Sequence, residues 1–211
     1  LMSDLLIKNL RSSTPGLTIQ GLKALDLVLH GTEITVLHGP SGSGKSLLLR
    51  AIADLDPSSG EVWLGNESRV SMKAHEWRKR VCYLPTESAW WFETVGEHFP
   101  RCDSVYFTRL GFEDDVLNWK ITRISSGEKQ RLALARCLSR SPDVLLLDEP
   151  TASLDEQRTV LVEEIVSDYS KHRNVPVLWV SHDRKQIKRI AHRLITIDSD
   201  GCIEELTEKK N

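Results

Sequence analysis

EITVLHGPSGSGKSLLLRAIADL, residues 33–55, places a glycine-rich loop between a compact apolar run and a segment with helical spacing. The loop at 39–46 matches G-x-x-x-x-G-K-[ST] at every fixed position, and it follows a predicted strand and precedes a predicted helix, as this pattern requires. Glycines let successive backbone N–H groups converge on phosphate oxygens, and the helix adds its positive end. The stretch therefore predicts a nucleoside-triphosphate site.

The residue types of the loop have separate expected roles. The lysine reaches the outer phosphates, and the hydroxyl of the serine after it ligates Mg²⁺. The predicted nucleotide-binding residues are Gly39, Pro40, Ser41, Gly42, Ser43, Gly44, Lys45, Ser46 and Leu47, of which Ser46 is also a predicted metal ligand.

The bulk composition excludes some classes of protein. A chain of 211 residues has room for one well-buried core, or for a main domain with a small appendage. With 28 Lys and Arg against 30 Asp and Glu, its formal charge is −2, and no nucleic-acid partner is expected. No apolar run approaches the roughly 20 residues needed to cross a bilayer, so the chain is not expected to span a membrane.

The four cysteines are Cys82, Cys102, Cys137 and Cys202. They lie far apart in the sequence, form no CxxC pair and follow no secretory leader. We expect them to be reduced thiols in a cytosolic protein.

Alternating strands and helices predict an α/β sandwich with crossover connections. VLLLDE at 144–149 is too continuously apolar for a half-exposed strand and fits the middle of a parallel sheet. The segment 86–120 is irregular and aromatic, and we expect a small helical lobe there. Strands are predicted at 5–10, 17–29, 33–38, 61–64, 81–84, 144–149, 175–181, 193–198 and 202–207, and helices at 46–55, 127–140, 156–171 and 183–191, with turns at 13–16 and 199–201.

Two carboxylates, Asp148 and Glu149, end the apolar strand VLLLDE. Side chains alternate along a strand, so neighbouring acids cannot do the same job. Asp148 is expected to hold hydrated Mg²⁺, and Glu149 to orient or deprotonate the water that attacks the γ-phosphorus.

His182 follows the apolar run VPVLWVS, at the carboxyl end of another predicted strand. Ligand groups of α/β sheets gather at this edge. A histidine in this place alone is more often structural, but its order after the loop and the acid pair favours contact with the γ-phosphate. We predict Glu149 and His182 as the catalytic residues.

A second candidate anion site is ISSGEKQR at 124–131. Ser125 offers a hydroxyl, Gly127 allows close backbone approach, and the helix that starts near Glu128 aims its positive end at an anion. By itself the segment fits an ordinary capped helix equally well.

Taken in order, GPSGSGKS, ISSGEKQR, VLLLDEPTASLD and VLWVSHD resemble the ATP-binding cassette (ABC) ATPases, over about 24–203. The resemblance implies a P-loop NTPase fold with a mixed sheet core, an N-terminal antiparallel β region and a small helical subdomain. It implies one domain over 2–211, with the helical subdomain at about 86–140 inserted in the core. It also implies ATP and Mg²⁺ as ligands, ATP hydrolysis, and a location at the cytoplasmic face of the plasma membrane.

In that family ISSGE is the signature motif, which binds the γ-phosphate held by the P-loop of a second subunit. Two anion sites in one chain would then serve different ATP molecules, in a head-to-tail dimer of two copies. The residues implied on this side are Ser125, Ser126, Gly127 and Glu128, together with Asp155 of ASLD.

Two departures from the family pattern concern the ligands. Thr86 occupies the place of the Q-loop glutamine, which contacts Mg²⁺ in the family, so Thr86 is a candidate metal ligand acting through a water. No Phe, Tyr or Trp precedes Trp63, and adenine is therefore expected to rest on an apolar side chain near 15–17.

Trp90, Trp91 and Phe92 follow Thr86, in the region that lines the permease groove of ABC transporters. Three adjacent large aromatics cannot all face one core, so at least one is expected to be exposed as an interface anchor; packing within the helical lobe is the alternative. The run 78–80 (RKR) is expected to be a solvated helix face.

Three functions remain open. A transporter ATPase acting on a separate permease is favoured, and the motifs look most like those of small bacterial systems that export iron or other metals. A soluble ABC ATPase of an assembly or repair system is the second, although neither a coiled-coil insertion nor a second cassette is present. A degenerate nucleotide-sensing scaffold is the third, against which Glu149 and His182 both count.

Overall fold

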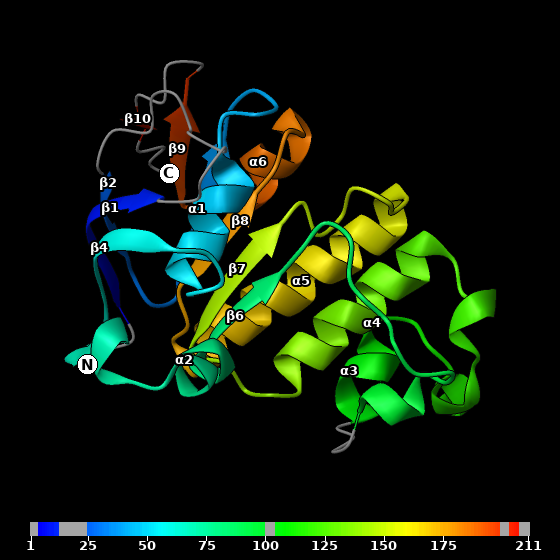
Figure 1. Cartoon of the computed structure of the whole chain (residues 1–211). Coiled ribbons are helices and arrows are strands. Elements are labelled where there is room, and N and C mark those ends of the chain that lie inside the picture. Colours follow the sequence, from blue (N-terminus) through cyan, green and yellow to red (C-terminus); the bar gives the residue numbers. More distant parts are fainter. Residues whose placement is uncertain (1–3, 13–24, 100–103, 199–202, 207–211) are drawn as a thin grey trace.

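The computed structural model of the chain describes residues 4–12, 25–99, 104–198 and 203–206. Figure 1 shows an antiparallel sheet on one side, a larger sheet in the centre and a helical region beyond it. The antiparallel sheet has the order β2-β1-β4-β5, and the larger one the order β10-β9-β3-β8-β7-β6. These architectural features confirm the predicted α/β class with an N-terminal antiparallel region.

The strands are β1 (Leu5–Ser12), β2 (Leu25–Leu29), β3 (Ile34–His38), β4 (Ser58–Leu64), β5 (Glu67–Ser68), β6 (Val81–Leu84), β7 (Val144–Asp148), β8 (Val177–Val180), β9 (Arg193–Ile197) and β10 (Ile203–Leu206). The helices are α1 (Lys45–Ile52), α2 (Ala74–Arg80), α3 (Ser104–Arg109), α4 (Ser126–Leu138), α5 (Glu156–Arg173) and α6 (Arg184–Ile190). Short 3₁₀ turns are η1 (Arg69–Ser71), η2 (Gly96–His98), η3 (Asp114–Asn118) and η4 (Ile121–Arg123).

The central strands are buried on both faces. β7 runs parallel between β6 and β8, and all five of its residues are buried. Side chains alternate across a strand, so Leu145 and Leu147 pack on one face while Val144 and Leu146 pack on the other. The continuous apolar run therefore marks a middle strand, as predicted.

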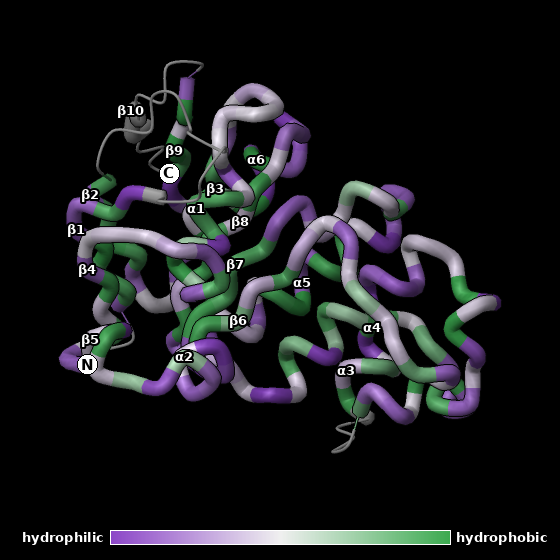
Figure 2. Tube along the Cα trace, viewed as in Figure 1, coloured by the Kyte–Doolittle hydropathy of each residue, from purple (hydrophilic) through white to green (hydrophobic). Residues whose placement is uncertain are grey.

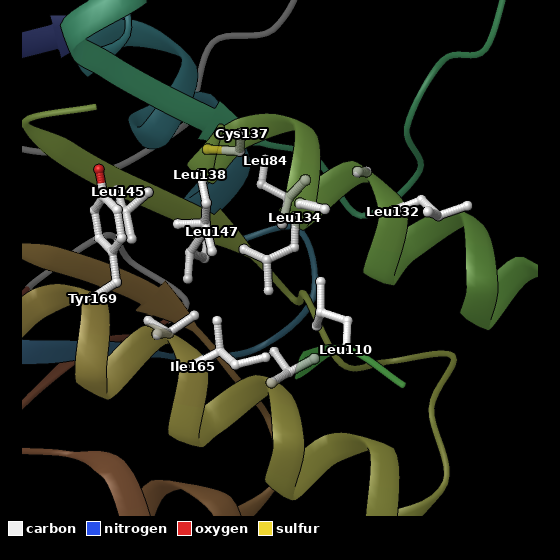
Figure 3. Close-up of a cluster of buried hydrophobic side chains, with 14 of the residues drawn as sticks. Leu84, Leu110, Leu132, Leu134, Cys137, Leu138, Leu145, Leu147, Ile165 and Tyr169 are labelled. Carbon is white, nitrogen blue, oxygen red and sulfur yellow. The ribbon is translucent and has the colours of Figure 1, made fainter. Parts of the chain in front are cut away.

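Each face of this sheet has its own hydrophobic cluster. On one face, residues of β7 and β8 pack against α4, α5 and the segments around α3; Figure 3 shows Leu134 and Leu138 of α4 above Ile165 of α5. On the other face, α1 lies between the large sheet and the antiparallel sheet, with Leu49 and Ile52 fully buried. In Figure 2 the central strand β7 is largely hydrophobic, which matches its burial on both faces.

Most predicted elements are present with shifted ends. β9 and β10 pair antiparallel, as expected for a closing hairpin. Within the strand predicted at 17–29, the described residues form β2, Leu25–Leu29. The predicted turns at 13–16 and 199–201, and the first part of the strand predicted at 17–29, lie outside the described residues. In the described part of the chain between β6 and β7, every regular element is a helix or a 3₁₀ turn.

The prediction of four reduced thiols is wrong for two of them. Cys82 of β6 and Cys137 of α4 are bonded as a disulfide, 55 residues apart in the sequence. The reason is packing: α4 covers β6 at the edge of the large sheet, and both cysteines are buried in that contact. Sequence spacing cannot report such a contact. Cys102 and Cys202 lie outside the described residues.

Among the described residues, none of the helices combines the length and apolarity needed to cross a membrane.

Candidate nucleotide site

The glycine-rich loop, Asp148, Glu149 and His182 lie at one edge of the large sheet. Strands β3, β7 and β8 are parallel neighbours, so their carboxyl ends lie together. β3 continues into the glycine-rich loop, β7 ends at Asp148, and β8 leads to His182. Backbone bonds tie these ends to one another: Glu149 N donates to Val180 O at 3.2 Å, and Ser181 N donates to Leu37 O at 3.3 Å.

The glycine-rich loop begins where no side chain fits. At Gly39, φ is +155°, and a Cβ atom would lie 2.3 Å from the carbonyl oxygen of Ile197. A larger residue would push the loop away from β9. The first fixed glycine of the motif is therefore required by packing in this chain, before any ligand is considered.

Lys45 closes the loop on itself. Its Nζ donates to Gly39 O at 3.0 Å and to Pro40 O at 2.7 Å, and the side chain is buried. Burial lowers the pKa of Lys45, and the nearby Glu149 and Asp148 oppose that shift. A buried ammonium held by carbonyl and hydroxyl oxygens of its own loop, with Ser43 Oγ at 3.5 Å, favours the approach of an anion.

The loop and α1 fit a phosphate. The N-cap residue of α1, Gly44, supplies no side-chain hydrogen bond, and the first turn carries no acidic residue. The N–H groups of the first turn of α1 and the positive end of its dipole are therefore free to act on a phosphate bound in the loop.

The residues present also fit Mg²⁺ held jointly with phosphate. Within the described residues, no group of three or more His, Cys, Asp or Glu side chains could hold a metal by itself. Mg²⁺ typically takes one or two protein oxygens and completes its shell with phosphates and water. Ser46 and Asp148 offer such a pair, and Asp148 is buried at the end of β7.

Asp148 is oriented by two residues of the segment that follows α2. Tyr83 donates its hydroxyl to Asp148 Oδ2 at 3.0 Å, and Thr86 donates its hydroxyl to the Asp148 carbonyl at 3.1 Å. Tyr83 was not singled out from the sequence; only the pairing of β6 with β7 reveals it. The Thr86 hydroxyl keeps acceptor lone pairs, so its role toward a metal stays a prediction.

Glu149 and His182 contact each other directly. His182 Nε2 lies 2.9 Å from Glu149 Oε1, and both side chains are about one-third exposed, at 38% and 32%. Glu149 has φ = +49°, an uncommon conformation for a residue other than glycine. The two side chains line a cavity of about 450 Å³, which leaves room for water beside the carboxylate.

The signature segment forms a complete capping box within the chain. Ser125 is the N-cap of α4: its Oγ accepts from Glu128 N at 3.2 Å, and its backbone N donates to Glu128 Oε2 at 2.8 Å. The Ser125 hydroxyl also donates to that carboxylate at 2.8 Å. The hydrogen bonds from Ser125, chiefly that of its backbone N–H, lower the pKa of Glu128. Ser125 and Ser126 are exposed.

The start of α4 packs closely on the segment after β7. A Cβ atom at Gly127 would lie 2.9 Å from the carbonyl oxygen of Ser153. Asp155 is the N-cap of α5 and accepts from Arg158 N at 2.8 Å. The structure thus places Gly127 and Asp155 near the same backbone segment, while α1 and α4 cover opposite faces of the sheet.

The aromatic run is organised by His98, a residue that the sequence did not point to. His98 is buried, and its Nε2 accepts from the backbone N–H groups of Trp91 at 3.0 Å and Phe92 at 3.1 Å. Trp91 and Phe92 are 61% and 47% exposed, whereas Trp90 is partly buried against the core. The expectation of an exposed aromatic is therefore confirmed for Trp91 and Phe92.

Arg136 of α4 stacks over Trp90 at 4.5 Å and over Trp91 at 5.1 Å. Burial, followed by the nearby Arg140, lowers the pKa of Arg136 to about 10. In the basic run of α2, Arg78 and Lys79 are exposed, but Arg80 forms ion pairs with Glu67 and Asp143. The residues near 15–17, expected to receive adenine, lie outside the described part.

Comparison with known proteins defines the class. Residues 22–152 match the family model described as ABC transporter. The probable iron export ATP-binding protein FetA of Escherichia coli (strain K12) is 33% identical over 189 residues, covering 83% of this chain and 84% of that protein. The chain therefore belongs to the ABC transporter family, and it is an ATPase of that family.

Other relatives are longer. The molybdenum import ATP-binding protein ModC of Pseudomonas syringae pv. tomato (strain ATCC BAA-871 / DC3000) is 31% identical over 193 residues, 82% of this chain and 53% of that protein. ModC of Vibrio parahaemolyticus serotype O3:K6 (strain RIMD 2210633) is 32% identical over 205 residues, 86% of this chain and 54% of that protein. The chain spans about half the length of these molybdenum-import relatives.

The fold agrees with a solved structure. The chain matches a structure described as the dimeric post-hydrolysis state of the ATP-binding cassette MJ0796 bound to ADP and Pi, with a TM-score of 0.80. The match covers 97% of this chain and 100% of that chain at 24% sequence identity, and so establishes the shared fold.

Proposed function

We propose that this chain is the ATP-binding and ATP-hydrolysing subunit of an ABC transporter, working as a head-to-tail pair on a separate membrane permease. The observation that carries the proposal is the split between the two anion sites. The glycine-rich loop meets Asp148, Glu149 and His182 at one sheet edge, whereas Ser125 lies on a helix that covers one face of that sheet. A second copy would supply the missing side.

Each residue of the loop edge has a defined part in hydrolysis. Lys45 leaves its carbonyl partners to bind the outer phosphates, and the N–H groups at the start of α1 hold their oxygens. Glu149 accepts the proton of the attacking water or orients it, and His182, in contact with Glu149, faces the γ-phosphate. Mg²⁺ held by Ser46 and Asp148 would neutralise the charge that develops on the phosphates.

The signature side completes the site across the dimer. Ser125, Ser126, Gly127 and Glu128 would contact the γ-phosphate bound by the partner subunit, with Asp155 at the same interface. ATP would hold the dimer closed, and its hydrolysis would loosen the dimer. The Ser125 hydroxyl donates to Glu128 in the single chain. To bind the γ-phosphate of the partner's ATP, this hydroxyl must rotate away from Glu128 and donate to the phosphate instead.

We also propose that Trp91 and Phe92, supported by Trp90 and His98, contact the permease. Exposed aromatics on a rigid base are typical anchors of an interface. The chain would then lie at the cytoplasmic face of the plasma membrane, as one ABC ATPase domain with residues 86–140 as its helical subdomain. The names of its relatives favour a metal species as cargo.

The decisive experiment is Glu149→Gln. This variant keeps the shape of the side chain but cannot accept a proton, so ATP and Mg²⁺ should shift it to a dimer on a sizing column, while ADP should not. Glu164→Gln, at an exposed position within α5 that does not line the cavity of Glu149 and His182, is the matched control and should behave as wild type. A monomeric elution of Glu149→Gln with ATP and Mg²⁺ would count against the proposed dimer.

A further inference from the structure

A second histidine lies beside the proposed catalytic pair. His38 is the last residue of β3, immediately before Gly39, and its side chain is half-buried. Its Nδ1 lies 3.0 Å from the carbonyl oxygen of Ser181. A carbonyl oxygen only accepts hydrogen bonds, so Nδ1 of His38 must carry the hydrogen. This bond fixes both the tautomer and the tilt of the His38 ring.

The ring fixed in this way contacts His182. The centroids of the two imidazoles are 5.8 Å apart with an interplanar angle of 66°, an edge-to-face arrangement that aromatic rings favour. His182 also reaches Glu149 Oε1 through Nε2 at 2.9 Å. A continuous series of contacts therefore runs from Ser181 O through His38 and His182 to Glu149.

His182 needs such support because its own chain position gives little. It follows β8 in a loop, and its side chain is 38% exposed. A side chain of this exposure would sample several rotamers in water. The ring contact with His38 and the contact of Nε2 with the Glu149 carboxylate both restrict these rotamers.

We propose that His38 is a positioning residue that holds the imidazole of His182 facing Glu149 before ATP arrives. The inference rests on the proposed roles of Glu149 and His182. His38 does not contact the reacting atoms; it acts through His182. A misplaced group near the reacting atoms lowers the rate of the chemical step more than it lowers substrate affinity.

The test uses three substitutions at position 38. His38→Val removes the ring and the donor and suits a β-strand; kcat should fall about tenfold, with the KM for ATP within about twofold of wild type. His38→Phe keeps a ring, and His38→Asn keeps a donor for Ser181 O, so both should restore part of kcat. The control is His172→Val, because His172 also bonds a backbone carbonyl through Nδ1, at 2.8 Å, but lies at the end of α5.

A spectroscopic readout separates positioning from loss of fold. In ¹⁵N-histidine-labelled protein, the His182 imidazole, assigned with His182→Gln, should show one tautomer protonated at Nε2. In His38→Val these nitrogen shifts should move toward a tautomer mixture, while the circular dichroism spectrum stays that of wild type. Unchanged His182 shifts in His38→Val would overturn the proposal, even if kcat fell.

The outcomes distinguish this inference from the proposed function. If His182→Gln is inactive while His38→Val keeps wild-type kcat and His182 shifts, the positioning role fails alone. If His182→Gln hydrolyses ATP at the wild-type rate, the catalytic role of His182 fails, and the positioning role falls with it.

Discussion

The two sides of the proposed ATP site differ in their burial and in the hydrogen bonds that their residues already make within one chain. The P-loop side, residues 39–46 with Asp148, Glu149 and His182, lies where three parallel strands end, and Lys45 and Asp148 are buried. The signature side, residues 125–128, is exposed at Ser125 and Ser126, and its serine is satisfied by its own Glu128.

The P-loop side is therefore built by the core of the fold, whereas the signature side is a helix start whose cap is completed by its own residues. Removing a charged side chain from the P-loop side, such as that of Lys45, should abolish chemistry at little cost in stability. A change on the signature side should affect both the dimer and the helix itself.

The largest effect is expected for Lys45→Met. Methionine fills a similar volume without the buried charge, so hydrolysis should fall at least about a hundredfold, because phosphate binding loses its cation. Stability should not fall, because the desolvation that lowers the pKa of Lys45 is removed. ATPase assays and urea unfolding test both effects, with the exposed Lys79→Met as control. A large loss of stability in Lys45→Met would show that the P-loop side depends on the ammonium for folding.

The next largest effect is expected for reduction of the disulfide between Cys82 and Cys137. Cys82 lies in the large sheet and Cys137 in the signature helix α4, so reduction should loosen that helix. Closing a loop of this length contributes about 2–4 kcal/mol, and reduction should lower the urea midpoint accordingly.

Alkylation of the denatured, unreduced protein checks the pairing itself. Two of the four cysteines should be modified before reduction and all four after it. Cys102→Ser should not change the urea midpoint of the oxidised protein. Four reactive thiols before reduction would contradict the pairing.

Ser125→Ala should produce a smaller effect with a distinct pattern. Loss of an N-cap hydroxyl costs about 1 kcal/mol of stability, and ATPase activity should fall about tenfold because the partner phosphate loses one hydrogen-bond donor. Binding of ATP by the monomer should be unchanged, since the P-loop side is intact. Ser126→Ala, in the same turn but outside the cap, is the control for the stability measurement alone. Equal activity of Ser125→Ala and wild type at all protein concentrations would remove the signature side from the site.

The smallest effect is a pH dependence at Glu128. Its pKa is lowered in the folded chain, chiefly by the Ser125 N–H group, so the unfolded state binds more protons as the pH falls. This stabilisation is fully present above the unfolded pKa of about 4.3 and is lost as the pH falls through the lower folded pKa. Wild type and Glu128→Gln should therefore differ in urea midpoint at pH 6 and converge as the pH falls below 4. A constant difference across this range would contradict the capping-box origin.

The sequence alone determined the class of the protein and most of its loop-side site. The glycine pattern before Lys45 predicts the conformation of the phosphate-binding loop. The continuous apolar run at 144–147 predicts a strand in the middle of a sheet. Motif order placed Asp148, Glu149 and His182 after their strands, and the parallel register does bring those strand ends together.

Contacts between residues that are distant in the chain became visible only in the folded structure. Tyr83 reaches Asp148 because β6 pairs with β7, and His38 contacts His182 because β3 lies beside β8. His98 accepts hydrogen bonds from the backbone of Trp91 and Phe92. The pairing of Cys82 with Cys137 reversed a conclusion drawn from spacing. A short sequence pattern predicts the backbone conformation of its own segment. Which distant side chains come into contact depends on the order of the strands and the packing of the helices, and no short stretch of sequence specifies these.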